Sequence, residues 1–347
     1  MAEQNFKDMI AASPRIFVLG VAGDSGSGKT TFTMALRAIF GADLVTRITL
    51  DDYHKYDREE RAALGITALH PDANRLAELM EDIVTLRKGG LIKKPVYDHA
   101  TGSFRTPVPF KAGKILILEG LHTLYTPEIR SLLDFSVFVE PDTDVKHEWK
   151  IRRDVDERGY RREDVLREIA EREPDYRAYI APQLTYADAV IRIRYSKYGR
   201  DIGISRNVYQ VSVSQVQLMG RETDNIDLAI DLHAILSLAE RDFSLEFIHG
   251  LKEGRNMGDL IIDGEPGSHV VRSLETSIER QTRVHPITVF SHRDYVTATE
   301  LAQLVLCWRI IHCRISHEIC RGEASPNVQA DKKIKVDLPN TVSQDKK

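Results

Sequence analysis

The sequence predicts an α/β fold, in which a mostly parallel β-sheet is flanked by helices and followed by a smaller C-terminal α+β region. Between residues 15 and 195, short apolar runs alternate with longer mixed segments. The apolar runs contain few polar residues, as is typical of strands that are buried on both faces of a sheet. Their alternation with helical segments favours parallel strands joined by crossover helices.

The elements of the first region can be assigned in order along the chain. Apolar runs predict strands at residues 16–21, 45–50, 115–119, 135–139 and 189–193. The mixed segments between them predict helices at residues 29–39, 75–88, 127–133, 143–158 and 163–180.

The pattern changes after residue 198. Period-two alternation and short apolar runs predict strands at residues 209–215, 226–232, 259–264 and 286–292. Apolar side chains recur with helical spacing over residues 297–320. We therefore expect three parts: a core domain at 14–198, an α+β region at 199–325 and a polar, loosely ordered tail at 326–347.

Composition excludes some classes of function. The chain has 347 residues, a net charge of −4 and an isoelectric point of about 6.3, which argues against nucleic-acid binding through bulk positive charge. No apolar run is long enough to span a membrane, and the N-terminus lacks the pattern of a secretion signal. We expect a cytoplasmic protein with no nucleic-acid and no membrane partner.

A glycine-rich stretch directly follows the first strand. Residues 23–30, GDSGSGKT, match the phosphate-binding pattern G-x-x-x-x-G-K-[ST] between a strand and a helix. Backbone N–H groups of such a loop surround phosphate, the lysine reaches the β- and γ-phosphates, and the Thr hydroxyl binds Mg²⁺. The pattern indicates a nucleoside triphosphate without identifying the acceptor. The predicted nucleotide-binding residues are Gly23, Asp24, Ser25, Gly26, Ser27, Gly28, Lys29, Thr30 and Thr31.

Two further segments suit phosphate chemistry. Glu119 ends an apolar strand and is placed to bind Mg²⁺ or its water, unless it is a strand-end carboxylate in solvent. On the predicted helix at 143–158, Lys150, Arg153 and Asp154 share a face, with Arg158 one turn further on. This helix is either a surface helix with ion pairs or an arginine lid over the phosphates.

The stretch LDDYHKYDR, residues 50–58, follows the second strand. Transfer of phosphate to an alcohol needs a carboxylate that orients the hydroxyl and accepts its proton, and Asp51 fits this role. We expect its strand to lie next to the first strand, which places Asp51 at the edge of the sheet where ligands bind. His54 and Arg58 would then contact a phosphate on the acceptor. An acidic turn with a solvated arginine is the alternative.

Two smaller features remain open. Residues 95–105, PVYDHATGSFR, add Tyr97 and His99 in a loop that is either part of the site or a plain turn. The three cysteines, at positions 307, 313 and 320, lie in the predicted C-terminal helix and do not form a disulfide framework. They either pack as small hydrophobic side chains or form a metal site with His312 and His317.

These motifs together resemble the phosphoribulokinases, within the phosphoribulokinase and uridine kinase group of P-loop kinases. The stretches GDSGSGKTTF, LDDYHKYDR, KPVYDHATG, ILEGLHTLY, WKIRRDVDERGY and YIAPQLTYADAVI occur in the order of the family and cover about residues 15–195. The phosphate loop, RRDVDERG and ADAVI are shared with uridine kinases. LDDYH, EGLH and the second region favour phosphoribulokinases, with a layout closest to the archaeal and the plant and cyanobacterial types.

The resemblance implies a P-loop kinase that uses ATP and Mg²⁺ to phosphorylate the 1-hydroxyl of ribulose 5-phosphate, acting as a homodimer. It implies a role for Asp51, Lys29 and Arg153 in catalysis, and for Thr30, Glu119 and Asp51 at the metal. The substrate-binding residues that it implies are His54, Arg58, Tyr97, His99, His122, Lys150, Arg153 and Arg158. The role of Asp52 stays open between a metal shell, a second acid and a structural cap.

Other readings of the same motifs remain. One is a uridine- or nucleoside-type kinase, and another is a nucleotide-binding regulator without transfer chemistry. Plant-type phosphoribulokinases can be switched off by a disulfide, and the two matching positions here are Ser27 and Thr49. Because neither is a cysteine, the resemblance implies an enzyme without this switch.

Overall fold

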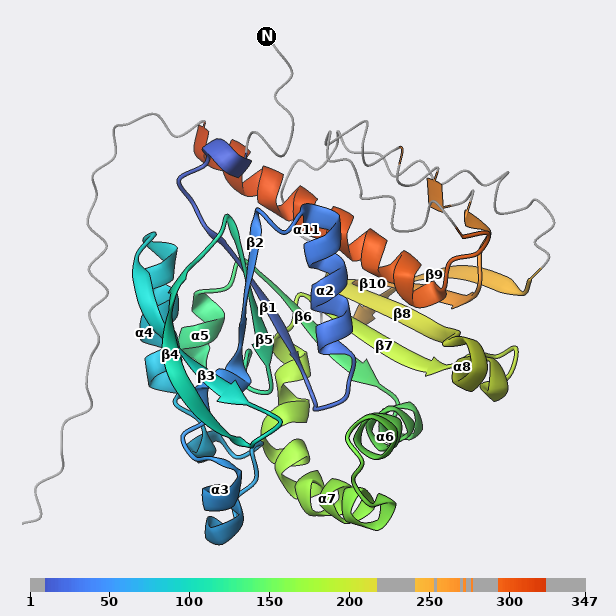
Figure 1. Cartoon of the computed structure of the whole chain (residues 1–347). Helices are drawn as coiled ribbons and strands as arrows, with labels where there is room; N and C mark the ends of the chain where they lie inside the picture. Colours follow the sequence, from blue (N-terminus) through green and yellow to red (C-terminus); the bar gives the residue numbers. More distant parts are fainter. Residues whose placement is uncertain are drawn as a thin grey trace, which may run out of the picture.

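An eight-stranded sheet forms the centre of the molecule, with strand order β2-β5-β1-β6-β7-β8-β10-β9 (Figure 1). The computed structural model describes residues 10–216, 241–252, 255–268, 271–272, 276 and 293–322. The strands predicted at 226–232 and 286–292, and the tail at 326–347, lie outside these residues.

The five strands predicted for the first region are confirmed, and all run parallel. One prediction of their order is wrong, because β2 pairs with β5 and not with β1. Since β5 separates β2 from β1, Glu119 at the end of β5 lies between the phosphate loop and the segment that carries Asp51. The strands are β1 (Phe17–Gly23), β2 (Val45–Thr49), β5 (Ile115–Gly120), β6 (Phe135–Pro141) and β7 (Ala189–Tyr195).

Three antiparallel strands extend this sheet. β8 (Tyr209–Val216) pairs with β7, β10 (Arg255–Gly264) pairs with β8, and β9 (Phe243–Lys252) pairs with β10. The predictions at 209–215 and 259–264 are confirmed, whereas β9 was not predicted. Strands from both sides of residue 198 thus belong to one sheet, and the division into domains there stays a prediction.

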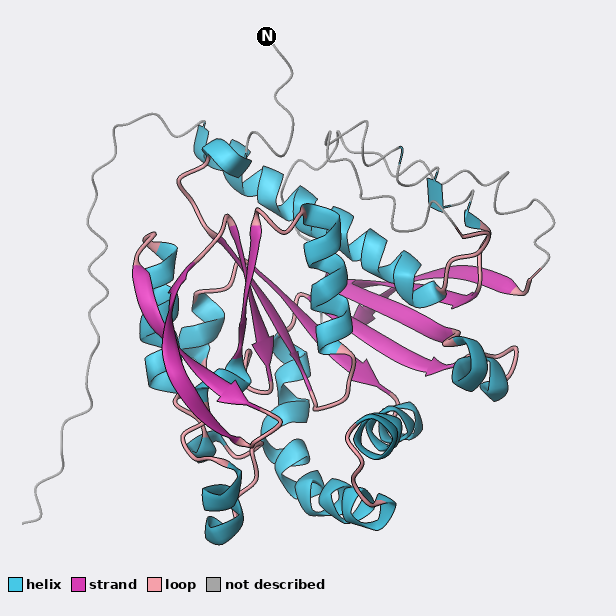
Figure 2. Cartoon of the chain, in the orientation of Figure 1, coloured by secondary structure: helices cyan, strands magenta, loops and turns pink. Residues whose placement is uncertain are grey.

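Helices cover both faces of the sheet (Figures 1 and 2). One face packs against α2 (Lys29–Phe40) and α11 (Ala298–Gly322), which share a core with alternate residues of β1, β6, β7 and β8. The other face packs against α4 (Leu76–Arg87) and α5 (Pro127–Ser131), through residues such as Ile83 and Ile129. The helices predicted at 29–39, 75–88, 127–133 and 297–320 are therefore confirmed.

Two helical segments lie beyond the carboxyl ends of the strands (Figure 1). The first is α6 (Thr143–Ile151), which continues as the π-helical η3 (Arg152–Glu157). The second is α7 (Arg162–Asp175), which continues as the π-helical η4 (Tyr176–Ile180) and the 3₁₀ segment η5 (Ala181–Tyr186). Both predicted helices, 143–158 and 163–180, are present, but each changes from α-helical to π-helical geometry in its last residues.

Several short elements were not predicted. A separate two-stranded ribbon consists of β3 (Leu91–Asp98) and β4 (Ser103–Lys111). Its strands contain Pro95, Pro107 and Pro109. Because proline has no N–H group to pair with a neighbouring strand, a strand tolerates it only at positions where that group would otherwise face solvent. The others are the 3₁₀ segments η1 (Leu50–Tyr53) and η2 (Pro71–Ala73) and the helices α3 (Arg58–Leu64) and α8 (Arg200–Arg206).

Candidate active site

The phosphate loop, residues 23–30, connects β1 to α2 in a conformation that requires glycine. Gly28 has a φ of 91° and precedes the first residue of α2, without a side chain that caps the helix. The first N–H groups of α2 are therefore available to an anion. A Cβ atom at Gly23 would lie 2.5 Å from the carbonyl oxygen of Val139, so the loop could not approach β6 with any other residue.

Lys29 is buried beside the loop that it follows. Its Nζ donates a hydrogen bond of 2.5 Å to the carbonyl oxygen of Asp24. Burial lowers the pKa of Lys29, while the carboxylates of Glu119 and Asp51 act in the opposite direction. A phosphate in the loop would add negative charge next to this ammonium group and favour its charged form.

Glu119 forms the floor of the site at the end of β5. Its Oε1 accepts a hydrogen bond of 2.5 Å from the Thr30 hydroxyl, and its Oε2 accepts 2.8 Å from Thr33 and 3.0 Å from Arg47. Oxygen ligands of this kind suit Mg²⁺, which proteins hold through one or two side chains together with substrate phosphates. Thr30 and Glu119 therefore could hold the metal ion of a bound nucleotide.

Asp51 lies in η1, directly after β2, between two imidazoles. Its Oδ2 lies 3.3 Å from Nε2 of His99, and its Oδ1 lies 3.8 Å from Nε2 of His54. Burial alone would raise the pKa of Asp51, but the hydrogen bond from His99 and the charges of His54 and Lys29 hold it well below its usual range. The carboxylate is therefore ionised at neutral pH.

The two histidines differ in environment. His54 is buried, and burial lowers its pKa although Asp51 acts against the shift. Its Nδ1 lies 2.9 Å from Oδ1 of Asn74, which fixes the ring. His99 is half exposed and packs edge-on against Tyr97, with a ring separation of 5.2 Å. His54 is therefore a hydrogen-bonding group with a fixed orientation beside Asp51.

Asp52 holds the β3–β4 ribbon next to Asp51. Its Oδ1 accepts 2.9 Å from the backbone N–H of Tyr97, and its Oδ2 accepts a close hydrogen bond from Lys94. Arg58 connects to the same ribbon, since its guanidinium donates 2.7 Å to the carbonyl oxygen of His99. Of the three roles left open for Asp52, these contacts favour the structural one.

Asp154, in η3, forms ion pairs with three cationic side chains. The carboxylate lies 2.9 Å from Nζ of Lys150, 2.8 Å from Nε of Arg153 and 3.1 Å from Nη1 of Arg158. Burial would raise the pKa of Asp154, but the hydrogen bonds from Arg153 and Lys150 lower it to about 2. This ionised carboxylate holds the three cations in one cluster.

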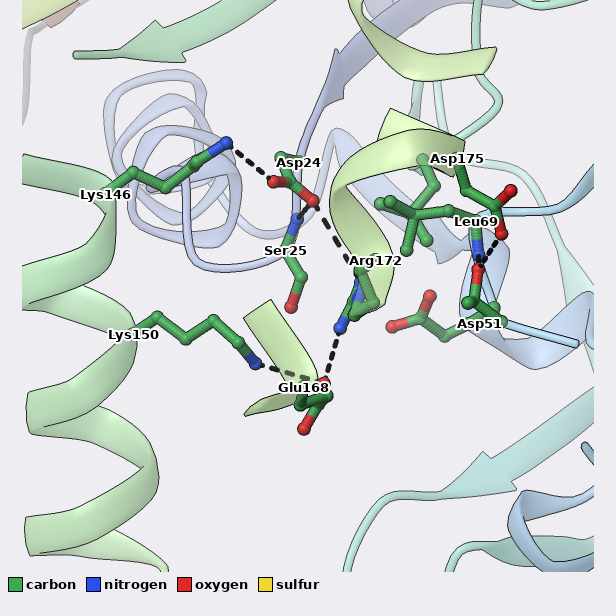
Figure 3. A network of polar contacts seen from close by, with 12 residues as sticks. Asp24, Ser25, Asp51, Leu69, Lys146, Lys150, Glu168, Arg172 and Asp175 are labelled. Atoms are coloured by element: carbon green, nitrogen blue, oxygen red, sulfur yellow. Dashed lines mark hydrogen bonds and ion pairs between the residues drawn. The ribbon is translucent and has the colours of Figure 1, made fainter. Parts of the chain in front are cut away.

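A second charge network joins α6 and α7 to the phosphate loop (Figure 3). Lys146 lies 2.9 Å from Oδ2 of Asp24 in the loop, and Arg172 lies 4.0 Å from its Oδ1. Glu168 of α7 accepts hydrogen bonds from Lys150, at 3.2 Å, and from Arg172, at 2.8 Å. The network ties both helices to the loop through charged side chains.

Most of these groups surround one cavity of about 770 Å³, although Asp24, Asp52 and Lys146 are not among the residues that line it. Among the residues that the structure describes, eight lysine and arginine side chains and six carboxylates line it. The excess of cations suits a substrate that carries phosphate.

Comparison with known families identifies the family of this chain. A family model described as the phosphoribulokinase / uridine kinase family matches residues 18–197. The chain belongs to this family.

Individual members of the phosphoribulokinase / uridine kinase family are similar to this chain over the same region. A phosphoribulokinase from Synechocystis is 48% identical over 179 residues, which are 52% of this chain and 54% of that protein. A chloroplastic phosphoribulokinase from Mesembryanthemum crystallinum is 41% identical over 201 residues, covering 53% and 51% of the two chains. The chain thus spans about half the length of the curated relatives that it matches.

The fold similarity extends further along the chain. The structure of a phosphoribulokinase from Rhodobacter spheroides matches with a TM-score of 0.52 at 20% identity and covers 87% of this chain and all of that one. At this identity the match shows the fold alone. It confirms the predicted α/β fold, a P-loop kinase core with a mostly parallel sheet, for this family member.

The structure brings most of the predicted site residues of this family member to the cavity. The wall includes the predicted residues Ser25, Gly26, Lys29, Thr30, Asp51, His54, Arg58, Tyr97, His99, Glu119, Lys150, Arg153 and Arg158. His122 is not among them: it is buried, its Nε2 lies 2.9 Å from the carbonyl oxygen of Leu69, and burial lowers its pKa to about 4. Ser27, Gly28 and Thr31 line a neighbouring cavity instead.

Sequence reasoning missed three cations in the wall, Arg47, Arg61 and Arg172. Arg47 could have been found from the sequence, because an arginine within a buried strand needs a partner of opposite charge. In the structure this partner is Glu119. Arg61 lies three residues after Arg58 on the same helix, so prediction of α3 would have found it. Arg172 is one of many charged residues in α7 and had no distinguishing pattern.

Proposed function

We propose that the chain transfers the γ-phosphoryl group of ATP to the 1-hydroxyl of D-ribulose 5-phosphate, which gives D-ribulose 1,5-bisphosphate and ADP. One observation carries the proposal: Asp51 lies in the same cation-rich cavity as Lys29, at the edge of the sheet where β1, β5 and β2 end. The names of the similar cyanobacterial and plant proteins support the choice of acceptor.

In this proposal the nucleotide phosphates bind the loop at residues 23–31, and Lys29 contacts their β- and γ-oxygens. Asp51 accepts a hydrogen bond from the 1-hydroxyl, aligns its oxygen with the γ-phosphorus and takes its proton. A low pKa is compatible with this role, because phosphoryl transfer passes through a loose transition state that needs little early proton removal. Arg153 neutralises charge on the transferring group.

We propose Thr30, Glu119 and Asp51 as the residues that would hold Mg²⁺. The ion would neutralise charge on the β- and γ-phosphates. Thr30 and Glu119 already lie together at the loop, and Glu119 retains its position through Thr33 and Arg47. These oxygen atoms fit a metal that is held mainly by the nucleotide.

The phosphate already carried by the acceptor needs cations of its own. We propose that Arg58, Lys150 and Arg158 contact it, together with the hydrogen-bonding side chains of His54, Tyr97 and His99. A neutral nucleoside would not need such a set. For His122, which does not line the cavity, we propose support of the wall through the Leu69 carbonyl group, next to Ala68.

The test is a coupled assay of ADP release with ATP, Mg²⁺ and one acceptor at a time. Ribulose 5-phosphate should be used with a much higher kcat/KM than ribose 5-phosphate or uridine. Preference for uridine would show a nucleoside-type kinase. Binding of ATP without turnover on any acceptor would show a nucleotide-dependent regulator.

We also propose a homodimer that works in the cytoplasm. Strand β9 is the last strand of the described sheet, and it exposes Phe247 and Ile248. A second copy would cover these side chains. In the described part of the chain, no helix is long and apolar enough to cross a membrane.

A further inference from the structure

Arg47 is a charged residue in the middle of β2, at one end of the central sheet. It lies opposite Ile117 of β5, so Glu119, two residues further along β5, is its diagonal neighbour on the same face of the sheet. Nη1 of Arg47 lies 3.0 Å from Oε2 of Glu119. The Arg47 side chain is 34% exposed and lines the cavity of the candidate active site. Arg47 thus connects a buried carboxylate to the substrate cavity.

Glu119 accepts hydrogen bonds from three side chains, and only one of them is charged. The hydroxyl groups of Thr30 and Thr33 donate hydrogen bonds of 2.5 Å to Oε1 and 2.8 Å to Oε2, respectively. Among the residues that the structure describes, Arg47 alone forms an ion pair with this carboxylate, whose side chain is 6% exposed. A buried charge is unfavourable unless an opposite charge is close. The two hydroxyl groups therefore fix the direction of the carboxylate, while Arg47 balances its charge.

A metal ion in this site would share the Glu119 carboxylate with Arg47. Because the Thr30 hydroxyl gives its proton to Glu119, the lone pairs of the Thr30 oxygen atom point away from that bond and suit a cation. Mg²⁺ would add two positive charges beside the guanidinium of Arg47, and like charges at close range repel each other. The charge of Arg47 should therefore oppose metal binding, in contrast to the two hydroxyl groups, which support it.

We propose that Arg47 is a built-in counter-ion of Glu119, which balances this carboxylate when no metal is bound and lowers the affinity of the site for Mg²⁺ when nucleotide is bound. Arg47 acts through Glu119 and is a positioning residue. If it acted only by orienting Glu119, its loss would weaken metal binding, as the loss of a group that holds a metal ligand usually does. The inference rests on the proposed Mg²⁺ site at Thr30 and Glu119 but not on the identity of the phosphate acceptor.

The test compares how strongly Mg²⁺ improves nucleotide binding in the wild type and in Arg47→Met, which keeps a long side chain but removes the charge. Isothermal titration calorimetry with the full chain and no sugar phosphate measures the Kd of a non-hydrolysable β,γ-imido analogue of ATP. Each protein is titrated once with excess Mg²⁺ and once with a chelator, and the ratio of the two Kd values gives the coupling between metal and nucleotide. We expect this ratio to rise about tenfold in Arg47→Met, because a like charge has been removed from the metal site.

Arg192→Met is the matched control for the loss of an ion pair between strands. Nε of Arg192, on β7, lies 3.1 Å from Oε2 of Glu140 on β6, and neither residue lines the site cavity or its neighbour. Both methionine variants should lower the melting temperature of the protein without ligand, since each leaves a partly or fully buried carboxylate without its cation. The ratio of Kd values should rise in Arg47→Met alone.

Two further variants separate charge from shape at position 47. Arg47→Lys restores a positive charge and should return the ratio of Kd values towards that of the wild type. If Arg47→Met does not fold, Arg47→Gln, which is also uncharged but keeps a hydrogen-bond donor for Glu119, should show the same rise in the ratio.

Three results would overturn the inference. One is a ratio in the uncharged variants that is equal to or lower than that of the wild type, which would leave Arg47 with an orienting role at most. The second is a ratio in Arg47→Lys as high as that in Arg47→Met. The third is a wild type whose nucleotide binding Mg²⁺ does not strengthen, which would also remove the proposed metal site. None of them bears on whether ribulose 5-phosphate is the acceptor, which the ADP-release assay decides.

Discussion

Asp51 carries its charge because His99, His54 and Lys29 surround it, and its substitution by asparagine tests the proposed role of this charge in catalysis. Asp51→Asn keeps the size of the side chain and removes its ability to accept a proton. We expect kcat to fall by about 10²–10⁴-fold, the usual contribution of general base catalysis, while ATP binding is kept.

Steady-state kinetics and nucleotide titration would check this prediction. Asp72→Asn serves as a control, since Asp72 is exposed and does not line the cavity. Turnover of Asp51→Asn at the wild-type rate would show that Asp51 is not the general base.

Asp154 should contribute to stability in a way that depends on pH. Its pKa in the folded protein is about 2, below the ordinary 3.8, so the stabilisation is complete above about pH 4 and is lost as the pH falls towards 2. A shift of this size corresponds to about 2 kcal/mol. Asp154→Asn should therefore lower the free energy of unfolding at pH 7 by about that amount, with a smaller difference from the wild type at pH 3.

Urea unfolding at the two pH values would measure this. Asp164→Asn on α7 is the matched control, because Asp164 pairs with Arg167 on the exposed surface and should contribute less than about 1 kcal/mol. A difference for Asp154→Asn that is the same at both pH values would contradict the assignment.

At the scale of elements, the turn between β3 and β4 controls Arg58. Gly102 has a φ of 74°, and a Cβ atom there would lie 2.9 Å from Cβ and Nε of Arg58. We expect Gly102→Ala to displace Arg58 and raise the KM for the sugar phosphate several-fold, with little change in the KM for ATP.

Gly89 provides the matched control. It has a φ of 79°, but a Cβ atom there would meet nothing within 4 Å among the described residues. Both alanine variants carry a similar backbone strain of about 1–2 kcal/mol. Equal kinetic effects of the two would show that strain, and not the contact with Arg58, is responsible.

The burial of cysteines in helix α11 determines how reactive their thiols are. Cys307 and Cys313 are buried in it as thiols, and burial raises the pKa of the Cys307 thiol well above its usual range. Because the thiolate is the reactive form, these cysteines should resist oxidation. With Ser27 in the phosphate loop, we expect equal activity after a mild disulfide oxidant and after a dithiol reductant. Inactivation that one Cys→Ser change abolishes would disprove this.

The sequence predicted those elements whose patterns arise from burial within the chain itself. β1, β5 and β6 are mostly apolar because both faces are covered, and α2 and α11 show the period of a helix with one buried side. The β3–β4 ribbon was missed because its strands have two open edges, tolerate proline and bury few side chains. β9 was missed because most of its residues are exposed.

The residues of the site were also predictable only where the signal lies within one continuous stretch of the chain. Residues in contiguous motifs, such as Lys29 and Asp51, could be assigned from the chain alone. Arg172 could not, because its place in the site depends on which helix the fold brings to the phosphate loop. The neighbour of β2 was predicted wrongly because apolar runs give no information on strand order.

The assembly can be tested at the scale of the whole molecule. If a second copy covers the edge of β9, light scattering at micromolar concentration should give twice the mass of the 39.4 kDa chain. Ile248→Lys would place a charge on an exposed position of this edge and should shift the protein towards a monomer, since charged residues protect edge strands. His147→Lys, on α6 away from the sheet edge, is the control. A wild-type monomer at this concentration would refute the dimer.

The continuous sheet also governs the order in which the protein can form during its synthesis. All five parallel strands leave the ribosome before β8, so at that stage β7 has a free edge and the apolar side of α2 lacks α11. Such an intermediate exposes the surfaces that drive aggregation. The nascent kinase core must therefore wait, or be shielded by chaperones, until more than a hundred further residues have been translated and α11 can close the core.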